Sequence, residues 1–370
     1  MAAFDALSFP IGATDPLAEI SWSTVTHIEV QHETFFAQAG LTAKDTGRED
    51  THKRREGVPI VLKDELKKGP GEEVRIRMRR QLTNTPRTAS TTYGTGSMLG
   101  SEEALVFCDV SVYLALLKNA VGHDSPDLYY HRTSIDMERE SEDALKEWLI
   151  ENHEECILDA FYDKFPYHVI QHHTSASTTV HPRIYYAGGV GDAAGMDSSR
   201  ILNTSECRRM RSYFINRRLN PIRIAGRKCA VVLADTFVLN DLRSEDDFRT
   251  DQGRANTRGA DNPIVNGAVE EYYQLYFHEY ERMRRTSSGA HSGNIAQLAL
   301  LGADAIAVAY GSEPRIVPRV ETAYGDRWGR AIRQVFGASR TDFQTSDNAT
   351  TINQSSAQWN VWEVRDEFAA

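Results

Sequence analysis

Histidine is concentrated in one short stretch of this chain, and a neutral imidazole is a common metal ligand. The stretch and its upstream neighbours hold six residues that could bind a metal: His153, Cys156, His168, His172, His173 and His181. The four-residue step from His168 to His172 suits two ligands on one helix face. β-branched residues around the histidines favour strand or loop instead, and no HExxH motif is present. We therefore expect a polar loop or interface and no metal; the alternative is a soluble metal-dependent enzyme using His168, His172 and His173.

A glycine-rich run at 188–195 follows a strand-like segment and contains the pattern GxGxxA, which can mark a dinucleotide site. Asp192 opposes that interpretation because its negative charge lies where a pyrophosphate would approach. The run also lacks a surrounding βαβ pattern, so we interpret it as a turn. The second glycine-rich run, 94–100, is not followed by the lysine of a phosphate loop, and no G-x-S-x-G motif is present. The sequence therefore indicates no catalytic residue and no cofactor.

Arginine forms two clusters that could contact phosphate or a neighbouring protein. The first alternates along a short segment as Arg75, Arg77 and Arg79, with Arg80 beside it. The second, between 208 and 228, contains eight cations and no carboxylate: Arg208, Arg209, Arg211, Arg217, Arg218, Arg223, Arg227 and Lys228. In a chain whose net charge is −10, an acidic surface on a neighbouring copy is the simpler partner.

Composition limits the classes of protein that this chain can be. Its 370 residues are 41% apolar and 25% charged, which is ordinary for globular proteins and excludes disorder, collagen and coiled coil as the main architecture. The net charge opposes a protein that only coats nucleic acid. Arginine accounts for 33 of the 42 cations and lysine for nine, which suits contacts between chains but also fits a bias in base composition.

We expect no export signal and no membrane span. The first twenty residues lack a basic region, and the most apolar run, 295–310, is too short to cross a bilayer and contains Asp304. The four cysteines, Cys108, Cys156, Cys207 and Cys229, form no CxxC pair, which indicates free thiols in a reducing compartment.

The first clear elements are two strands and a long helix. Apolar and arginine residues alternate between 74 and 82, and 104–117 is suited to a partner strand. About twenty polar and small residues separate the two, far more than a hairpin needs, so the loop should reach outside its own domain. Residues 135–164 then show apolar positions at three- and four-residue steps, with carboxylates opposite, which predicts a helix roughly 40 Å long.

The remaining pattern is mixed. It predicts a basic helix capped by Thr204 or Ser205, a buried strand at 228–234, a polar loop at 243–262, a strand at 272–278 and a buried helix at 294–310. Residues 167–202 should be rich in strand and loop, and the first 56 should form an irregular charged arm.

Several segments, in this order, resemble one family. They are 60–66 (IVLKDEL), 69–82 (GPGEEVRIRMRRQL), 100–112 (GSEEALVFCDVSV), 143–151 (DALKEWLIE), 262–264 (NPI) and 300–311 (LLGADAIAVAYG). Together with the charged arm, the outsized hairpin and the long helix, they resemble the major capsid proteins of tailed phages, which have the Hong-Kong-97-type fold, and particularly their N-four-like branch. The resemblance covers residues 55–345.

The resemblance implies an α+β chain divided into an N-terminal arm (1–56), an extended loop (57–120), a peripheral domain (121–219) with its spine helix at 135–164, an axial domain (220–335) and a C-terminal segment (336–370) returning to the peripheral domain. It implies a structural, non-catalytic subunit of an icosahedral virion shell, assembled from pentamers and hexamers in the host bacterial cytoplasm. The further partners would be packaged double-stranded DNA, contacted non-specifically, and scaffolding, decoration and portal proteins. Another virion or tail protein is a further alternative.

Under this resemblance the residues expected to touch neighbouring subunits lie in the hairpin and the basic helix. They are Lys63, Asp64, Arg75, Arg77, Arg79, Arg80, Arg87, Tyr93, Arg208, Arg209, Arg217 and Arg218.

Overall fold

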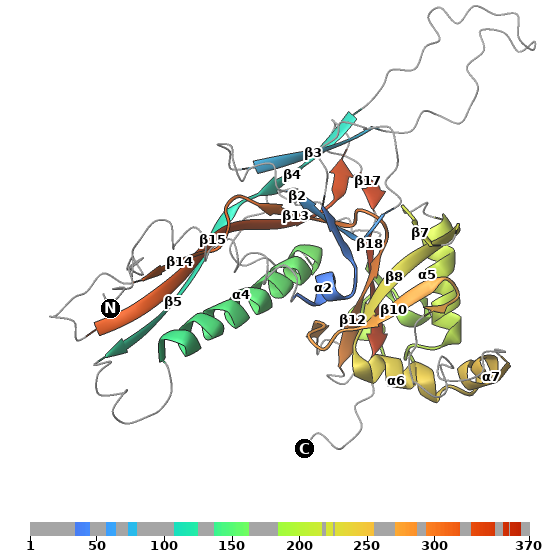
Figure 1. The fold of residues 1–370 in the computed structure, drawn as a ribbon. Coiled ribbons are helices and arrows are strands. Elements are labelled where there is room, and N and C mark those ends of the chain that lie inside the picture. The colour runs from blue at the N-terminus through green and yellow to red at the C-terminus, as the bar shows by residue number, and fades with distance from the viewer. Residues whose placement is uncertain are drawn as a thin grey trace, which may run out of the picture.

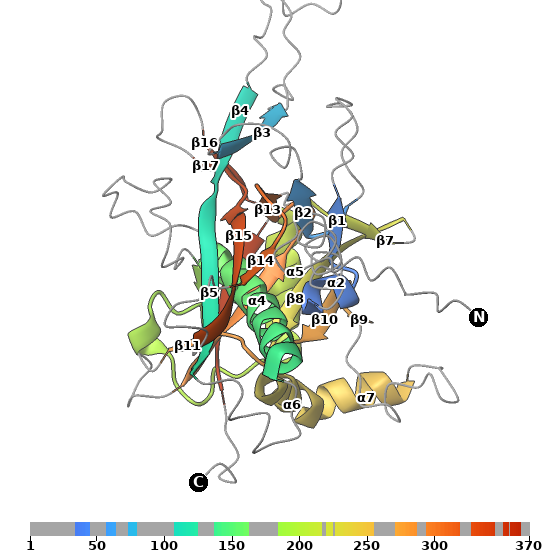
Figure 2. The same ribbon diagram turned by 60° about the vertical axis from the view of Figure 1, so that its left-hand side comes forward.

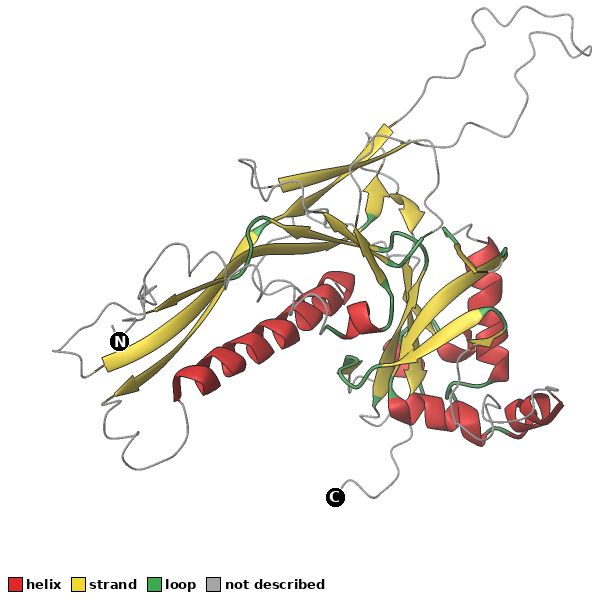
Figure 3. Ribbon diagram, in the orientation of Figure 1, coloured by secondary structure: helices red, strands yellow, loops and turns green. Residues whose placement is uncertain are grey.

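The computed structural model describes residues 34–44, 57–63, 73–79, 107–124, 137–162, 184–216, 220–224, 226–254, 271–286, 294–318, 327–344, 351–354 and 356–363. Two large sheets and several helices make up this α+β chain (Figures 1 and 3). Each sheet combines strands from distant parts of the sequence.

The first sheet has six strands and includes the long ribbon seen in Figure 1. Its order is β1 (Thr42–Lys44), β2 (Ile60–Lys63), β13 (Ile306–Tyr310), β15 (Arg327–Arg340) and β14 (Arg315–Pro318), and β5 (Ala115–Asp124) also pairs with β15. The strand β15 runs antiparallel to β5 over ten residue pairs, from Arg327 opposite Asp124 to Phe336 opposite Ala115.

The helix α4 (Met137–Tyr162) lies along one face of the β5–β15 ribbon (Figure 2). Leu145 and Leu149 of the helix pack against Ile316 of β14 and Ile332 of β15. The C-terminal half of α4 joins a larger core with strands of the second sheet. The predicted helix at 135–164 is thus confirmed, and it connects the two sheets.

The second sheet has eight strands. Its order is β6 (Ile184–Tyr186), β18 (Ser356–Trp362), β12 (Ile295–Leu301), β8 (Arg227–Ala234), β10 (Leu275–Glu279) and β9 (Glu271–Tyr272). Two short strands join it: β11 (Arg285–Thr286) pairs with β12, and β7 (Ile222–Ile224) pairs with β8. The helices α5 (Thr204–Asn216), α6 (Thr236–Ser244) and α7 (Asp246–Arg254) contribute apolar residues to its core.

Two further strand pairs form separate two-stranded sheets. The strands β3 (Glu73–Arg79) and β4 (Phe107–Tyr113) form the predicted antiparallel pair, and β16 (Asp342–Gln344) pairs with β17 (Thr351–Gln354). In both views β3 and β4 lie near the top of the molecule, and α6 and α7 lie near the bottom (Figures 1 and 2).

The predicted buried helix at 294–310 is wrong: this segment forms β12 and β13, which lie in different sheets. Between them the backbone turns at Asp304, whose φ is 55°. Residues buried on every side lose the alternation that distinguishes strand from helix, so the pattern permitted either.

Three smaller expectations are also corrected. Part of the arm is regular, because α2 (Phe35–Gln38) and β1 occur in it, and part of the polar loop at 243–262 is the helix α7. The helix at 204 is capped not by Thr204 or Ser205 but by Asn203, whose side-chain oxygen accepts a hydrogen bond of 2.9 Å from the Glu206 amide.

Candidate assembly surfaces

The described residues include only some of the predicted contact residues. Lys63, Arg75, Arg208 and Arg209 are described with their side chains, and Arg77 and Arg79 only as backbone of β3. Asp64, Arg80, Arg87, Tyr93, Arg217 and Arg218 lie outside the described residues, as do His168, His172, His173 and His181.

The root of the β3–β4 pair is held by a small apolar contact. Val74 and Val112 are buried against Ala307 and Ala309 of β13. This footing attaches the pair to β13, and β4 also contacts β15 and β16.

Two glycines allow the chain to pass closely from β4 into β5. A Cβ added at Gly337 of β15 would collide with the carbonyl oxygen of Tyr113. A Cβ at Gly311 would lie 2.9 Å from the Leu114 side chain. The backbone therefore approaches β15 at Tyr113–Leu114, where a larger residue in β15 does not fit.

The predicted arginine row on β3 is partly neutralised within its own strand. Arg75 is 67% exposed and lies 2.6 Å from the Glu73 carboxylate. Such a pair contributes little to stability, and the Arg75 side chain remains exposed to solvent.

The predicted basic helix α5 is likewise partly neutralised. The Arg208 guanidinium donates to the Tyr273 hydroxyl at 2.8 Å and lies over its ring, which raises the pKa of Arg208. Arg209 lies 2.7 Å from Glu206 and keeps 53% of its side chain exposed.

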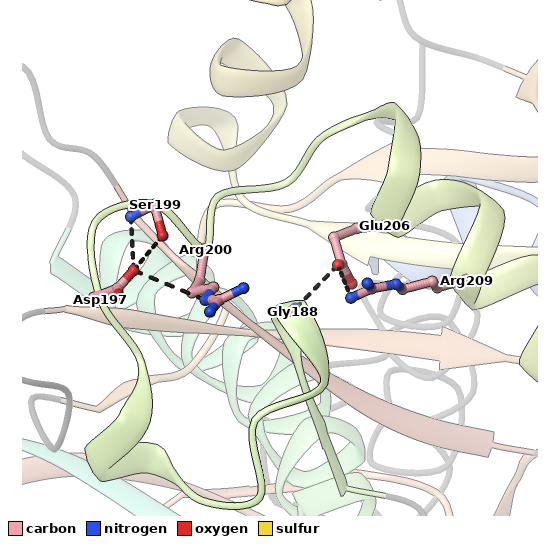
Figure 4. A network of polar contacts seen from close by, with 6 residues as sticks. All are labelled: Gly188, Asp197, Ser199, Arg200, Glu206 and Arg209. Carbon is pink, nitrogen blue, oxygen red and sulfur yellow. Dashed lines mark hydrogen bonds and ion pairs between the residues drawn. The ribbon is translucent and has the colours of Figure 1, made fainter.

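Glu206 links the 188–195 run, the helix α5 and the strand β18. Its buried carboxylate accepts hydrogen bonds from the Gly188 amide at 3.0 Å and from Arg209 (Figure 4). It also accepts one from the Trp359 indole at 3.3 Å. The 188–195 run is thereby fixed to α5 and β18.

The glycine-rich run is a turn, as predicted. Gly188 and Gly189 have positive φ angles of 76° and 75°, and a Cβ at Gly188 would collide with the Arg200 side chain. Figure 4 shows Arg200 next to Asp197, whose carboxylate also accepts two hydrogen bonds from Ser199. No α-helix follows the run directly, so it lacks the helix N-terminus that holds a pyrophosphate.

An arginine group that the sequence did not single out joins the two sheets. Arg282 lies 2.6 Å from Glu151, and Arg284 forms an ion pair with Asp159, both on α4. Three arginines at 282, 284 and 285, directly after an aromatic strand, were the available signal.

Arg285, the third member, holds two buried carboxylates together. It pairs with Asp235, the cap of α6, and lies 2.8 Å from Glu363. Burial raises the pKa of Asp235, which the guanidinium opposes and Glu363 reinforces. Removing Arg285 would leave two like charges in the interior.

The arm is attached to the same region. The Glu154 carboxylate of α4 accepts hydrogen bonds from the Phe35 amide at 2.6 Å and from the Tyr280 hydroxyl at 3.0 Å. The rings of Phe35 and Phe36 contact Tyr280, and Phe36 is fully buried. Burial and Glu154 raise the pKa of Tyr280, so it stays a hydrogen-bond donor.

The described part of the chain contains no group of histidine, cysteine and carboxylate residues that could hold a metal ion. Cys156 is buried, and burial followed by the Glu155 charge raises its pKa to about 12. Among the described helices none is both long and apolar enough to cross a bilayer.

Comparison with known proteins identifies the family of this chain. Residues 20–359 match the family described as phage capsid protein. This chain belongs to the phage capsid protein family. No curated protein sequence matches it.

Solved capsids share the fold. The Ralstonia phage GP4 capsid matches with a TM-score of 0.65 and 19% identity, covering 85% of this chain and 90% of that one. The cyanophage Pam1 capsid gives 0.70 and 16% over 84% and 90%, and the acid-stable capsid of Helicobacter pylori bacteriophage KHP30 gives 0.64 and 14% over 88% and 91%. The predicted Hong-Kong-97-type α+β fold is therefore confirmed, and the protein is a structural, non-enzymatic component of the virion capsid.

Proposed function

We propose that this capsid protein assembles into pentamers and hexamers that close as an icosahedral shell around double-stranded DNA. The observation that carries the proposal is the β3–β4 pair, which extends from the body on a small apolar footing. A two-stranded pair is marginally stable by itself, so the part that projects beyond this footing is stabilised when another subunit covers it.

The domain division is part of the same proposal. Residues 1–56 form the arm and 57–120 the extended loop, while the ranges 121–219, 220–335 and 336–370 contribute to the peripheral and axial domains. Strand pairing supports a refinement in which the six-stranded sheet with α4 is peripheral and the eight-stranded sheet is axial. In this refinement β13, β14 and β15 are peripheral.

The arginine group at 282–285 suits this division. In a shell, neighbouring subunits contact both sheets, so the two sheets need a fixed relative orientation. The ion pairs of Arg282 and Arg284 with α4 connect the helix to the second sheet and hold that orientation. Individual contacts between subunits can stay weak, because every subunit makes several of them.

Within this proposal the packaged DNA is contacted non-specifically, and the further partners are scaffolding, decoration and portal proteins. Assembly takes place in the host bacterial cytoplasm. The contact candidates named from the sequence act at these interfaces.

Electron microscopy of the expressed protein, alone and with the neighbouring structural proteins of its source, tests the proposal. We expect closed shells with fivefold and sixfold capsomers. Subunits that stay monomeric or form only small oligomers under all these conditions would overturn it.

A further inference from the structure

Three cations form a row across the face of the first sheet that points away from α4. Arg333 of β15 is paired with Lys118 of β5 on one side and with Arg315 of β14 on the other. Their chain neighbours Ile332 and Leu117 are buried, Ile332 against α4. Since successive residues of a strand point to opposite faces, the three cations point away from the helix, and all three are exposed.

Apolar residues border this row on both sides. On the same face, Leu116 is paired with Val335, and Ala120 is paired with Ala331, which is paired in turn with Val317. Leu116 is 54% exposed, the most exposed of the large apolar side chains in the described part of the chain. We call these eight residues the cationic patch; its members are Arg315, Val317, Leu116, Lys118, Ala120, Ala331, Arg333 and Val335.

The patch is costly in an isolated subunit. Lys118 and Arg333 lie directly opposite each other, and like charges in that position destabilise a sheet. Leu116 and Ala120 beside them are exposed apolar residues. Both costs disappear if a partner brings carboxylates over the row and covers the rows beside it. Cations bordered by apolar residues suit contact with a protein surface, which can cover both kinds of side chain. A nucleic acid backbone would contact the cations through its phosphates and leave the apolar residues uncovered.

A surface of the matching charge lies on α4 itself. Asp143, Glu147, Glu151 and Glu155 follow one another at four-residue steps, and all four are exposed. Like charges at this spacing destabilise a helix, so a cationic surface laid along the stripe would stabilise it. Glu151 is paired with Arg282, and Asp143 lies 4.0 Å from Arg139.

The two surfaces match in size. Strands lie about 4.8 Å apart, so the three cations span roughly 10 Å. Carboxylates four residues apart on a helix are about 6 Å apart along its axis, so three of them span roughly 12 Å.

We propose that the acidic stripe of α4 in one copy docks on the cationic patch of a second copy. The inference rests on the proposed shell only in that many copies meet side by side. Because the contact joins two different surfaces, it is head-to-tail, which generates rings rather than closed dimers. The patch is far smaller than a stable interface of roughly 800 Å² per partner, so it guides and orders a larger contact.

Charge reversal and exchange test this contact. Lys118→Glu with Arg333→Glu should reduce the yield of shells about tenfold, as should Asp143→Lys with Glu147→Lys, because like charges then face each other. The four changes together exchange the signs of the two central cations and of two facing carboxylates, so opposite charges can meet again and most of the yield should be recovered. The matched control, Lys44→Glu with Arg249→Glu, makes the same change in net charge at two exposed cations outside both surfaces and should assemble normally.

Circular dichroism of each variant separates loss of assembly from loss of folding. If the first pair assembles like the control, or if the fourfold variant assembles no better than either pair, the proposal is wrong. A recovered fourfold variant cannot be explained by misfolding of its parents.

Carbodiimide cross-linking provides the second measurement, because it joins Lys118 directly to a carboxylate in contact with it. In a mixture of isotopically labelled and unlabelled copies we expect mixed-mass links from Lys118 to Asp143, Glu147 or Glu151. Links only to a different protein, or protection of Lys118 that nuclease abolishes, would overturn the assignment. Should the wild type form no shells, mixed-mass links in concentrated subunits would still support the contact while the proposed function fails.

Discussion

The imidazole ring of His153 is stacked on the phenyl ring of Phe336, with the two centroids 4.3 Å apart and 15° between the ring planes. His153 belongs to α4 and Phe336 to β15, and the imidazole Nε2 lies 2.7 Å from the Gln334 side-chain oxygen. A histidine that the sequence grouped with possible metal ligands is therefore a buried contact between helix and sheet.

His153→Ala should destabilise the subunit by about 2–4 kcal/mol, because it leaves a cavity and removes the partner of a buried amide. Denaturant unfolding of the subunit measures this. His278→Ala, at a half-buried histidine of β10, is the control and should cost less than about 1 kcal/mol. Equal losses would contradict the role of the stack.

Gly337→Ala should disrupt the close approach of Tyr113, at the junction of β4 and β5, to β15. The new methyl group collides with the Tyr113 backbone rather than with a flexible side chain. We expect a loss of about 1–3 kcal/mol or an insoluble product. Gly191→Ala is the matched control, since a Cβ there meets no atom within 4 Å. Comparable soluble yields and melting temperatures for the two variants would argue against this close approach.

Arg285→Leu should destabilise the subunit by about 3–5 kcal/mol near neutral pH, because it leaves Asp235 and Glu363 buried without a cation. Burial already holds the pKa of Asp235 above its ordinary value of 3.8, and loss of the guanidinium raises it further. A raised carboxyl pKa favours the protonated folded state, so the deficit should be full above the folded pKa and shrink as pH falls toward 3.8.

Unfolding of both proteins at several pH values measures this difference. The double variant with Glu363→Gln should recover part of the loss, because only one buried carboxylate remains. A deficit that is independent of pH would show that lost packing, not charge, is responsible.

Cys156 should resist alkylation in the folded subunit. At a pKa of about 12 only about one thiol in ten thousand is ionised near pH 8, and the thiolate is the reactive form. Cys207 and Cys229 are buried as well and serve as comparisons. Mass spectrometry after iodoacetamide treatment, with and without denaturant, should find these three labelled only after unfolding; rapid labelling of the native protein would contradict their burial.

Deleting residues 84–100 should leave a folded subunit that forms no shells. These residues lie outside the described part of the chain, between β3 and β4, and the prediction follows from the proposed contact with a neighbour. Circular dichroism and electron microscopy of the deletion variant measure the two outcomes. Normal shells would remove the loop from the assembly contact.

The sequence by itself determined the elements whose pattern is local. Alternation identified β3, and three- and four-residue steps identified α4, because these periods follow from backbone geometry alone. The order of these elements, with the motifs between them, was enough to indicate the family. The extended hairpin also had a local signal, since its loop is far longer than two paired strands need.

The tertiary structure decided what depends on pairing between distant residues. Residues 295–310 are apolar except at Gln297, Gly302 and Asp304, so only their partners in two different sheets made them strands rather than a helix. Likewise Lys118 lies opposite Arg333, which lies opposite Arg315, and both arginines are far from Lys118 in the sequence. Register is set by the packing of whole sheets, and no period along one strand records which residue lies opposite.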